Sequence, residues 1–425
     1  MGYLKTKFKR LLEKIEDRIE GEKEPETNDD RKVFAHYMVG LTCHQTVEQW
    51  VHDIKTAKEA GIDGFALNIG PSDPWTETQL SHAYHEAEEL GEFVMFISFD
   101  MACGEWSVSQ VVDLINRFRE SSAQFIVDGR PLVSTFEGPG WAENWISVRE
   151  QTGNIFLVPD WSSLGPYGIS DVIDGAFSWD AWPKAGQNQM NINEDLLYCD
   201  NLKGKKYMMG VSPYFYTNLP QWNKNWYCSS ESLWHDRWQQ VLDVLPDFVQ
   251  IITWNDFGES SYICDTVPAQ VVEGAEEYVN GYSHSAFRAV LPYFIAAYKS
   301  GSRLVDFPED TVIAWYRTTP ASAGEGCGTT WGQGGEIPAS QGARDVVSVM
   351  ALVKVPTNIT VAIGSRWKSV GTRIDSPLSY FEIPFDGSAT GPVTIAMNGK
   401  TVEGPSITNE CHEGRMHFNS IVIRL

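Results

Sequence analysis

Positive charge and long apolar runs are both scarce in this chain. Its 425 residues hold 33 Lys and Arg against 56 Asp and Glu, for a formal net charge of −23. A surface of that sign repels phosphate backbones, so we expect no nucleic acid partner. No run of about 18 apolar residues occurs, and we therefore expect no membrane-spanning helix.

Signatures of metal and cofactor binding are missing too. The seven cysteines are scattered without a C-x-x-C pair, which argues against a zinc site or a disulfide framework; at most, Cys327 and Cys411 are expected to pair. No G-x-G-x-x-G follows the first predicted strand, and no G-x-S-x-G nucleophile elbow occurs. Several acidic residues are expected at the ends of the predicted strands, so a site for a divalent cation is an alternative. No H-x-H motif accompanies these acids, which argues against it. We therefore expect no metal and no cofactor.

Residues 1–31 are predicted to form a separate N-terminal segment. Their longest apolar run is two residues, so the apolar region of a secretory signal is missing, and we expect an intracellular chain or one released by another route. Met1-Gly2 with Thr6 fits the short N-myristoylation pattern, which a start introduced by cloning also mimics. An amphipathic helix that covers a domain face is predicted from apolar residues at helical spacing: Leu4, Phe8, Leu11, Ile15 and Ile19.

From residue 32 onward, strand-like apolar runs alternate with helical periods. Helix signatures such as 46–61 and 76–91 open at Thr and close at Gly, as helix caps require. This alternation predicts a parallel sheet covered by helices, and eight strands are the number that a closed barrel needs. We predict an α/β fold with a (β/α)8 TIM barrel over residues 32–305, with a doubly wound open sheet as the alternative. The predicted strands are 32–40, 64–70, 93–101, 131–138, 154–163, 175–182, 207–217 and 248–258.

The pattern changes after the segment SRLVDFPED. Residues 311–425 hold short β-rich runs separated by Gly, Pro, Ser and Asn, with no convincing helix. They predict a C-terminal β-sandwich domain over residues 306–425. We favour a packing role that stabilises the barrel, with glycan binding as the alternative.

Acidic and aromatic side chains gather at the predicted strand ends. In a β/α barrel the C-terminal strand ends form one shared rim, where active sites lie. Few cations occur there, and tryptophans are close in sequence, so the rim suits a neutral polyhydroxylated ligand. The strand-end residues are Asn68, Asp100, Glu137, Asp160, Asp180, Tyr214, Tyr216, Asp256 and Glu259, with His36 inside the first strand and Trp254-Asn255 before Asp256.

The segment IITWNDFGES places two carboxylates three residues apart at the end of the last strand. Glycoside hydrolysis needs one protonated carboxyl and one ionised carboxylate. Asp256 and Glu259 can form that pair only if the chain turns at Phe257-Gly258, because positions i and i+3 of a strand face opposite ways. We expect Glu259 to be the general acid and Asp256 the general base; the sequence leaves the reverse order open. The alternative is a turn-capping Asp256 and a solvated Glu259.

Six segments of the chain resemble one known family. They are VFAHYMVG (33–40), GIDGFALNIG (61–70), FISFDM (96–101), FSWDAW (177–182), SPYFYTNLP (212–220) and ITWNDFGES (252–260). In this order they are similar to glycoside hydrolase family 71, the fungal α-1,3-glucanases also called mutanases. The similarity runs from about residue 32 to about 300 and continues more loosely through the β-rich tail.

The resemblance implies endo-acting hydrolysis of α-1,3-glucan with inversion at the anomeric carbon, by a monomer that binds the polysaccharide or its oligosaccharides. The paired acids of the family fall on Asp256 and Glu259. A non-catalytic α-glucan-binding protein with the same cleft is the alternative. The family lines its cleft at Asp100, Trp179, Asp180, Tyr214 and His284, and we add Trp254, Asn255, Asn68 and His36 as candidate substrate-binding residues.

Overall fold

The computed structural model describes residues 30–324, 326–386, 389–409 and 416–425. The predicted amphipathic helix and its acylation pattern lie outside these residues. Cys411 lies outside them as well, so the predicted pair with Cys327 falls outside the described part of the chain.

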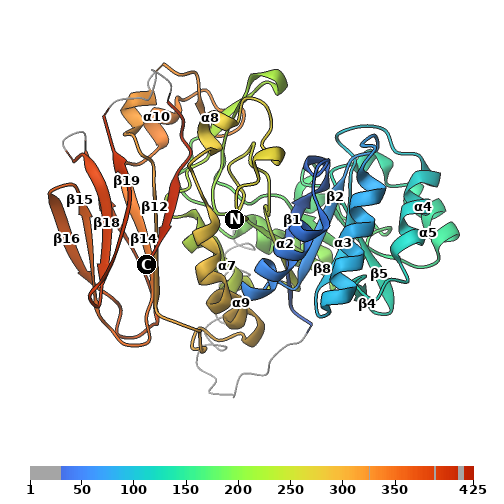
Figure 1. Ribbon diagram of the computed structural model, residues 1–425. Helices are drawn as coiled ribbons and strands as arrows, with labels where there is room; N and C mark the ends of the chain where they lie inside the picture. Colours follow the sequence, from blue (N-terminus) through green and yellow to red (C-terminus); the bar gives the residue numbers. More distant parts are fainter. Residues whose placement is uncertain (1–29, 325, 387–388, 410–415) are drawn as a thin grey trace, which may run out of the picture.

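Eight parallel strands form a closed barrel in the first two thirds of the chain (Figure 1). Each strand pairs with the next, and parallel pairing of β11 with β1 and of β3 with β5 completes the ring. The barrel strands are β1 (Lys32–Met38), β2 (Gly64–Ile69), β3 (Val94–Asp100), β5 (Arg130–Phe136), β6 (Phe156–Asp160), β7 (Gly175–Ser178), β8 (Lys206–Val211) and β11 (Phe248–Ile251); β4 (Ile126–Val127) adds to β5 in the antiparallel sense.

Helices cover the outside of the barrel, and their apolar faces pack on the strands. The Thr46 and Ser107 hydroxyls cap α2 and α4, each in a reciprocal capping box with the glutamine three residues on. The α-helices are α2 (Val47–Glu59), α3 (Thr76–Leu90), α4 (Val108–Phe118), α5 (Asn144–Thr152), α6 (Asn193–Leu202), α7 (Leu233–Val244), α8 (Glu276–Val279), α9 (Leu291–Ser300) and α10 (Ala339–Gly342). Short 3-10 turns are η1 (Val39–Leu41), η2 (Pro139–Trp141), η3 (Gly165–Tyr167), η4 (Pro220–Trp222), η5 (Pro268–Gln270), η6 (Ser285–Val290) and η7 (Ala321–Gly324).

The predicted barrel is confirmed, but the predicted strands 154–163, 175–182, 207–217 and 248–258 are too long, the last two by the most. Run 207–217 breaks after Val211, where Ser212-Pro213 follows, because proline has no N–H to give to the ladder. The chain then forms an antiparallel hairpin of β9 (Tyr216–Leu219) and β10 (Lys224–Tyr227). The last barrel strand ends at Ile251, so the WNDFGES segment is a loop above the barrel.

Two four-stranded antiparallel sheets face each other in the C-terminal region, beside the barrel in Figure 1. They enclose their own apolar cluster, which includes Val347, Val361 and Ile395. One sheet holds β12 (Thr311–Tyr316), β14 (Val346–Leu352), β17 (Leu378–Pro384) and β20 (Ile421–Arg424). The other holds β15 (Asn358–Ile363), β16 (Arg366–Gly371), β18 (Gly391–Met397) and β19 (Lys400–Ile407). These sheets are consistent with the predicted sandwich, and we propose that its boundary with the barrel lies near residue 305.

The core of the barrel's helical layer continues into the C-terminal region. Trp315, Met350 and Phe418 are buried in the same apolar cluster as helix residues such as Trp234 and Phe287. A short strand of the C-terminal region, β13 (Thr330–Trp331), pairs with β10 and makes the hairpin a three-stranded sheet. The two regions therefore share both a core and a sheet.

Candidate active site

The loop after β11 brings Asp256 and Glu259 to the C-terminal end of the barrel. A tight turn forms here, since the N–H of Ser260 donates to the carbonyl of Phe257 at 3.1 Å. The Asp256 Oδ1 atom accepts the backbone N–H of Glu259 at 3.1 Å, which ties the two acids together. The turn that the sequence required is therefore present.

Gly258 serves this turn by its small size. A Cβ atom there would lie 3.1 Å from Val272 Cγ2 and 3.2 Å from Leu219 Cδ1, tighter than ordinary packing. The left-handed backbone angle in the loop belongs instead to Ser260, with φ of 56°. Tyr278 on α8 adds a hydrogen bond from its hydroxyl to the Gly258 carbonyl at 2.7 Å. A larger side chain at 258 would require Val272 and Leu219 to shift.

The two carboxylates have different surroundings. Burial raises the pKa of Asp256 to about 7, and the negative charge of Glu259 adds to the rise while Lys224 opposes it. Glu259 Oε1 lies 2.6 Å from the Lys224 ammonium, and the Glu259 side chain is only 15% exposed. Asp256 is therefore protonated up to near neutral pH, with the Lys224–Glu259 contact beside it.

A third acid, Asp100, shares this lysine. It ends β3, and its Oδ1 atom accepts the N–H groups of Ala102 at 2.9 Å and Cys103 at 3.0 Å. Burial raises the pKa of Asp100, while these hydrogen bonds and Lys224 act against the rise. Burial lowers the pKa of Lys224, but the charges of Glu259, Asp256 and Asp100 together raise it above its ordinary value. The Lys224 ammonium thus interacts with three strand-end carboxylates.

Asp160 and Glu137 form a second acidic group, at the ends of β6 and β5. Asp160 is fully buried; its Oδ1 accepts the N–H of Ser162 at 2.9 Å and the Ser162 hydroxyl, whereas its Oδ2 has no partner among the described residues. Burial raises the pKa of Asp160 to about 7, and the charge of Glu137 contributes. Glu137 accepts hydrogen bonds from Ser163, and its φ is 54°. Asp160 is therefore protonated up to near neutral pH.

Trp179 and Asp180 follow β7 and belong to the same rim. The Trp179 ring lies among aromatic neighbours, 4.8 Å from His36 and 4.8 Å from Phe136 between ring centroids. His36 lies buried inside the barrel, where Gln250 contacts its Nδ1 at 2.9 Å and burial lowers its pKa to about 3. A neutral His36 thus supports Trp179. Burial raises the pKa of Asp180, whose carboxylate lies 3.8 Å from Lys184.

Four candidate residues lie within protein contacts. Tyr214 donates its hydroxyl to the Phe418 carbonyl at 2.7 Å, and His284 Nε2 contacts the Ser420 carbonyl at 3.0 Å, so both bind the C-terminal segment. Trp254 is fully buried against Phe65. Asn255 accepts the N–H of Met38 at 2.8 Å and donates to the Met38 carbonyl and to Gln270.

These four side chains hold strand ends and the C-terminal segment in place beneath or beside the rim. Asn68, at the end of β2, is 4% exposed and lies deep in the barrel mouth. Among the sequence candidates, the structure brings Asp256, Glu259 and Asp100 together around Lys224, with Trp179 and Asp180 elsewhere on the rim.

Lys224 is a site residue that the sequence analysis missed. It was expected that cations hardly occur at the rim, and the carboxylate it binds is 35 residues away in sequence. A usable signal was the run from Tyr216 to Tyr227, which reads as two short strands around Pro220 and Asn223. Recognition of that hairpin would have placed Lys224 opposite Leu219, beside the rim.

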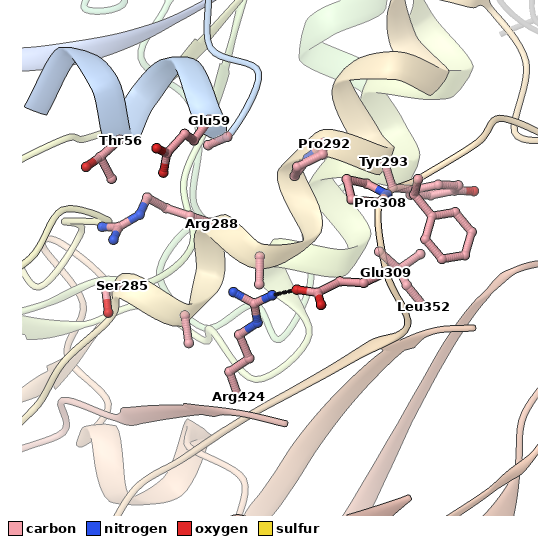
Figure 2. A pocket seen from close by; sticks show the side chains of 14 residues that line it. Thr56, Glu59, Ser285, Arg288, Pro292, Tyr293, Pro308, Glu309, Leu352 and Arg424 are labelled. Carbon is pink, nitrogen blue, oxygen red and sulfur yellow. Dashed lines mark hydrogen bonds and ion pairs between the residues drawn. The ribbon is translucent and has the colours of Figure 1, made fainter. Parts of the chain in front are cut away.

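Figure 2 shows a cavity of about 410 Å³ elsewhere in the molecule. It lies where α2, η6 and α9 meet the C-terminal region, with Arg288 and Glu59 on one side and the Arg424–Glu309 ion pair on the other. None of the strand-end acids lines it. In the part of the chain that the structure covers, no cluster of three or more His, Cys, Asp and Glu could hold a metal ion, and no helix is long and apolar enough to cross a membrane.

Comparisons with known proteins identify the family of the chain. Residues 29–425 match the family described as Glycosyl hydrolase family 71. The chain is 36% identical over 403 residues to the glucan endo-1,3-alpha-glucosidase agn1 of Schizosaccharomyces pombe, covering 90% of this chain and 92% of that protein. It is also 36% identical over 415 residues to a mutanase of Penicillium rubens, covering 92% of this chain and 88% of that protein.

Among solved structures, the barrel resembles a GH99 endo-alpha-mannosidase from Bacteroides thetaiotaomicron. The TM-score is 0.51 at 13% identity, and the match covers 65% of this chain and 99% of that chain. At this identity the likeness describes the fold alone, and it supports the (β/α)8 barrel.

Proposed function

The chain belongs to glycosyl hydrolase family 71 and is a glycoside hydrolase, and from that premise we propose that it cleaves internal linkages of α-1,3-glucan with inversion at the anomeric carbon. The named relatives, an endo-1,3-alpha-glucosidase and a mutanase, support the substrate and the endo mode. The observation that carries the catalytic assignment is the partly buried Asp256–Glu259 pair, in which Asp256 has a pKa raised to about 7 and Glu259 contacts Lys224.

The pair can perform both halves of an inverting reaction. One carboxyl group protonates the leaving glycosidic oxygen, while the other carboxylate takes a proton from the water that attacks the anomeric carbon from the opposite face. Both steps need the singly protonated pair. Because the pKa of Asp256 is about 7, we expect activity to fall as the pH rises above about 7 and the last proton is lost.

The order of acid and base is a separate part of the proposal. The position of Glu259 beyond Gly258 favours Glu259 as the acid, whereas burial raises the pKa of Asp256 to about 7 and so favours a proton on Asp256 in the free protein. Chemical rescue separates the two orders. Azide is expected to restore turnover only in the variant that lacks the base, and a substrate with an activated leaving group only in the variant that lacks the acid.

Substrate contacts are proposed at the rim. Trp179 is partly exposed and can stack on a glucose ring, and Asp180 and Asp100 can accept hydrogen bonds from sugar hydroxyls. We further propose that the protein acts as a monomer. Its exposed large apolar side chains lie singly on separate elements, for example Ile126, Trp222 and Trp367. Light scattering during size-exclusion chromatography tests that point.

Hydrolysis is tested by incubation of the protein with insoluble α-1,3-glucan, with β-1,3-glucan and starch as matched controls. We expect reducing ends from the α-1,3-glucan alone, and NMR of the first product should show the β-anomer. Faster release from starch or β-1,3-glucan would contradict the linkage assignment, and an α-anomer appearing first would contradict inversion. Binding without release by the parent protein would favour the non-catalytic glucan-binding alternative.

A further inference from the structure

We propose that Lys224 is a positioning residue for the reaction: it holds Glu259 in place, and the C-terminal region fixes the strand that carries this lysine. The inference rests on the proposed function, because it takes Asp256 and Glu259 as the catalytic pair. It adds to that function a residue from outside the WNDFGE segment and a role for the C-terminal region in the chemistry of the barrel.

The contact between Lys224 and Glu259 is short and shielded. Lys224 Nζ lies 2.6 Å from Glu259 Oε1, and the two side chains are 35% and 15% exposed. A charge-assisted hydrogen bond of this length, partly removed from water, is stronger than a surface ion pair. It restrains the Glu259 side chain, and the charge of Lys224 also lowers the pKa of the neighbouring Asp256.

The hairpin of β9 and β10 presents Lys224 to the site. Lys224 pairs with Leu219, and Trp226 pairs with Thr217, so these side chains share one face. Asn225 and Tyr227 alternate onto the opposite face. The face that carries Lys224 is turned toward Glu259, and the opposite face is turned toward the C-terminal region.

Contacts from the C-terminal region hold that opposite face. The Thr329 hydroxyl donates to Asn225 Oδ1 at 2.7 Å, and the N–H of Gly332 donates to the Tyr227 carbonyl at 2.7 Å. Tyr227 stacks on Phe418 at 5.4 Å between ring centroids. Strand β13 also pairs with β10 at Trp226 and Tyr227. The strand of Lys224 is thus paired on both edges, by β9 and by β13.

The other titratable groups near the pair do not replace this charge. Asp256 and Asp100 are acids, and Lys224 acts on both. Tyr278 and Cys228 also lie in the field of Glu259, and burial raises the pKa of each well above neutral pH, so both are uncharged there. Lys224 therefore supplies the positive charge that faces the pair.

Removal of this charge has a definite effect on the pH profile. The reaction requires one proton on the pair, so the rate falls at low pH when a second proton binds and at high pH when the last proton leaves. A neighbouring cation lowers both of these pKa values. Without Lys224 both limbs should move to higher pH, by about one to three pH units, which is the usual effect of such a cation on a carboxylate.

The test compares kcat/KM of the full-length protein and of Lys224→Met on soluble α-1,3-gluco-oligosaccharides from about pH 4 to 9. We expect both limbs of the Lys224→Met profile at higher pH and at least about a tenfold loss on the acidic side, with Lys224→Arg returning the limbs toward their original positions. The matched control is Lys206→Met. Lys206 is also 35% exposed and bonds Asp247 at 2.8 Å, but it begins β8 at the opposite end of the barrel, so its profile should not move.

The outcomes separate the inference from the function on which it rests. A uniform loss of rate in Lys224→Met with unmoved limbs would leave Lys224 a merely structural residue and overturn the inference. If Asp256→Asn and Glu259→Gln kept near-parental rates, the catalytic pair itself would be wrong. Thr329→Val tests the C-terminal contact: a shift in the same direction as Lys224→Met but smaller supports it, and an unchanged profile removes that part of the proposal.

Discussion

Asp256→Asn and Glu259→Gln should have the same effect on activity and opposite effects on stability. Each replaces an ionisable group by a neutral one of the same shape, so each should lower kcat by at least about a hundredfold. Their contributions to folding differ. Ionisation of Asp256 lowers the free energy of unfolding, whereas Glu259 is paired with Lys224.

The expected size follows from the pKa of Asp256. A carboxyl whose folded pKa is raised above its unfolded value binds its proton more tightly in the folded state, so the stability it contributes is present below the unfolded pKa of 3.8 and is lost as the pH rises through about 7. The separation between 3.8 and about 7, at about 1.36 kcal/mol per pKa unit, corresponds to about 4 kcal/mol. This is an upper limit for the gain of Asp256→Asn near pH 8, because the variant also loses attraction to Lys224.

Glu259→Gln should instead lower the free energy of unfolding near pH 8 by about 1–3 kcal/mol, since it leaves the partly buried Lys224 ammonium without its charged partner. Urea unfolding midpoints of the parent and the two variants, measured near pH 4 and near pH 8, show whether each variant is more or less stable than the parent. The advantage of Asp256→Asn should shrink toward pH 4. An Asp256→Asn protein that is less stable than the parent near pH 8, or whose difference from the parent does not change with pH, would refute the reasoning.

Three further predictions concern the rim and the C-terminal region. Asp160→Asn should gain stability relative to the parent as the pH rises from about 4 to 8, since burial raises the pKa of Asp160 to about 7; urea midpoints check this, and the exposed Asp306→Asn should show no such trend. Trp179→Ala should weaken binding of α-1,3-gluco-oligosaccharides about two- to tenfold, measured by calorimetry, with a smaller change in kcat. A chain that ends near residue 305 should aggregate or lose activity, because the shared apolar core would be exposed; a soluble and fully active product would contradict this.

The barrel was predictable because each strand carries its own signal. Runs such as 64–70 are apolar apart from Asn68, as expected for strands buried on both faces, and helices between them begin at capping residues such as Thr46. The predicted strand bounds were wrong where a short break interrupts a longer apolar run. Strand 207–217 was drawn through Ser212-Pro213 because the residues on both sides of that break are aromatic or aliphatic.

The site was predictable only as far as strand ends determine it. Asp256, Glu259 and Asp100 lie at the rim because the barrel brings all strand ends to one face. The direction of a side chain within a loop depends on tertiary packing that a single sequence does not encode. Trp254 therefore turns into the helical layer and Tyr214 toward Phe418, and Lys224 reaches Glu259 from a hairpin that the sequence analysis did not predict.

The pairing of β10 with β13 also affects the order in which parts of the fold can form during synthesis. Trp226 and its partner Thr330 are about a hundred residues apart, so the ribosome releases the hairpin long before the strand that completes its sheet. The eight barrel strands end at Ile251 and can close while β13 is still being made. A nascent barrel of this kind has all its strand-end acids but no third strand beside Lys224. The third strand of this sheet comes from a distant segment, and any exchange of the C-terminal region between relatives must carry a matching hairpin with it.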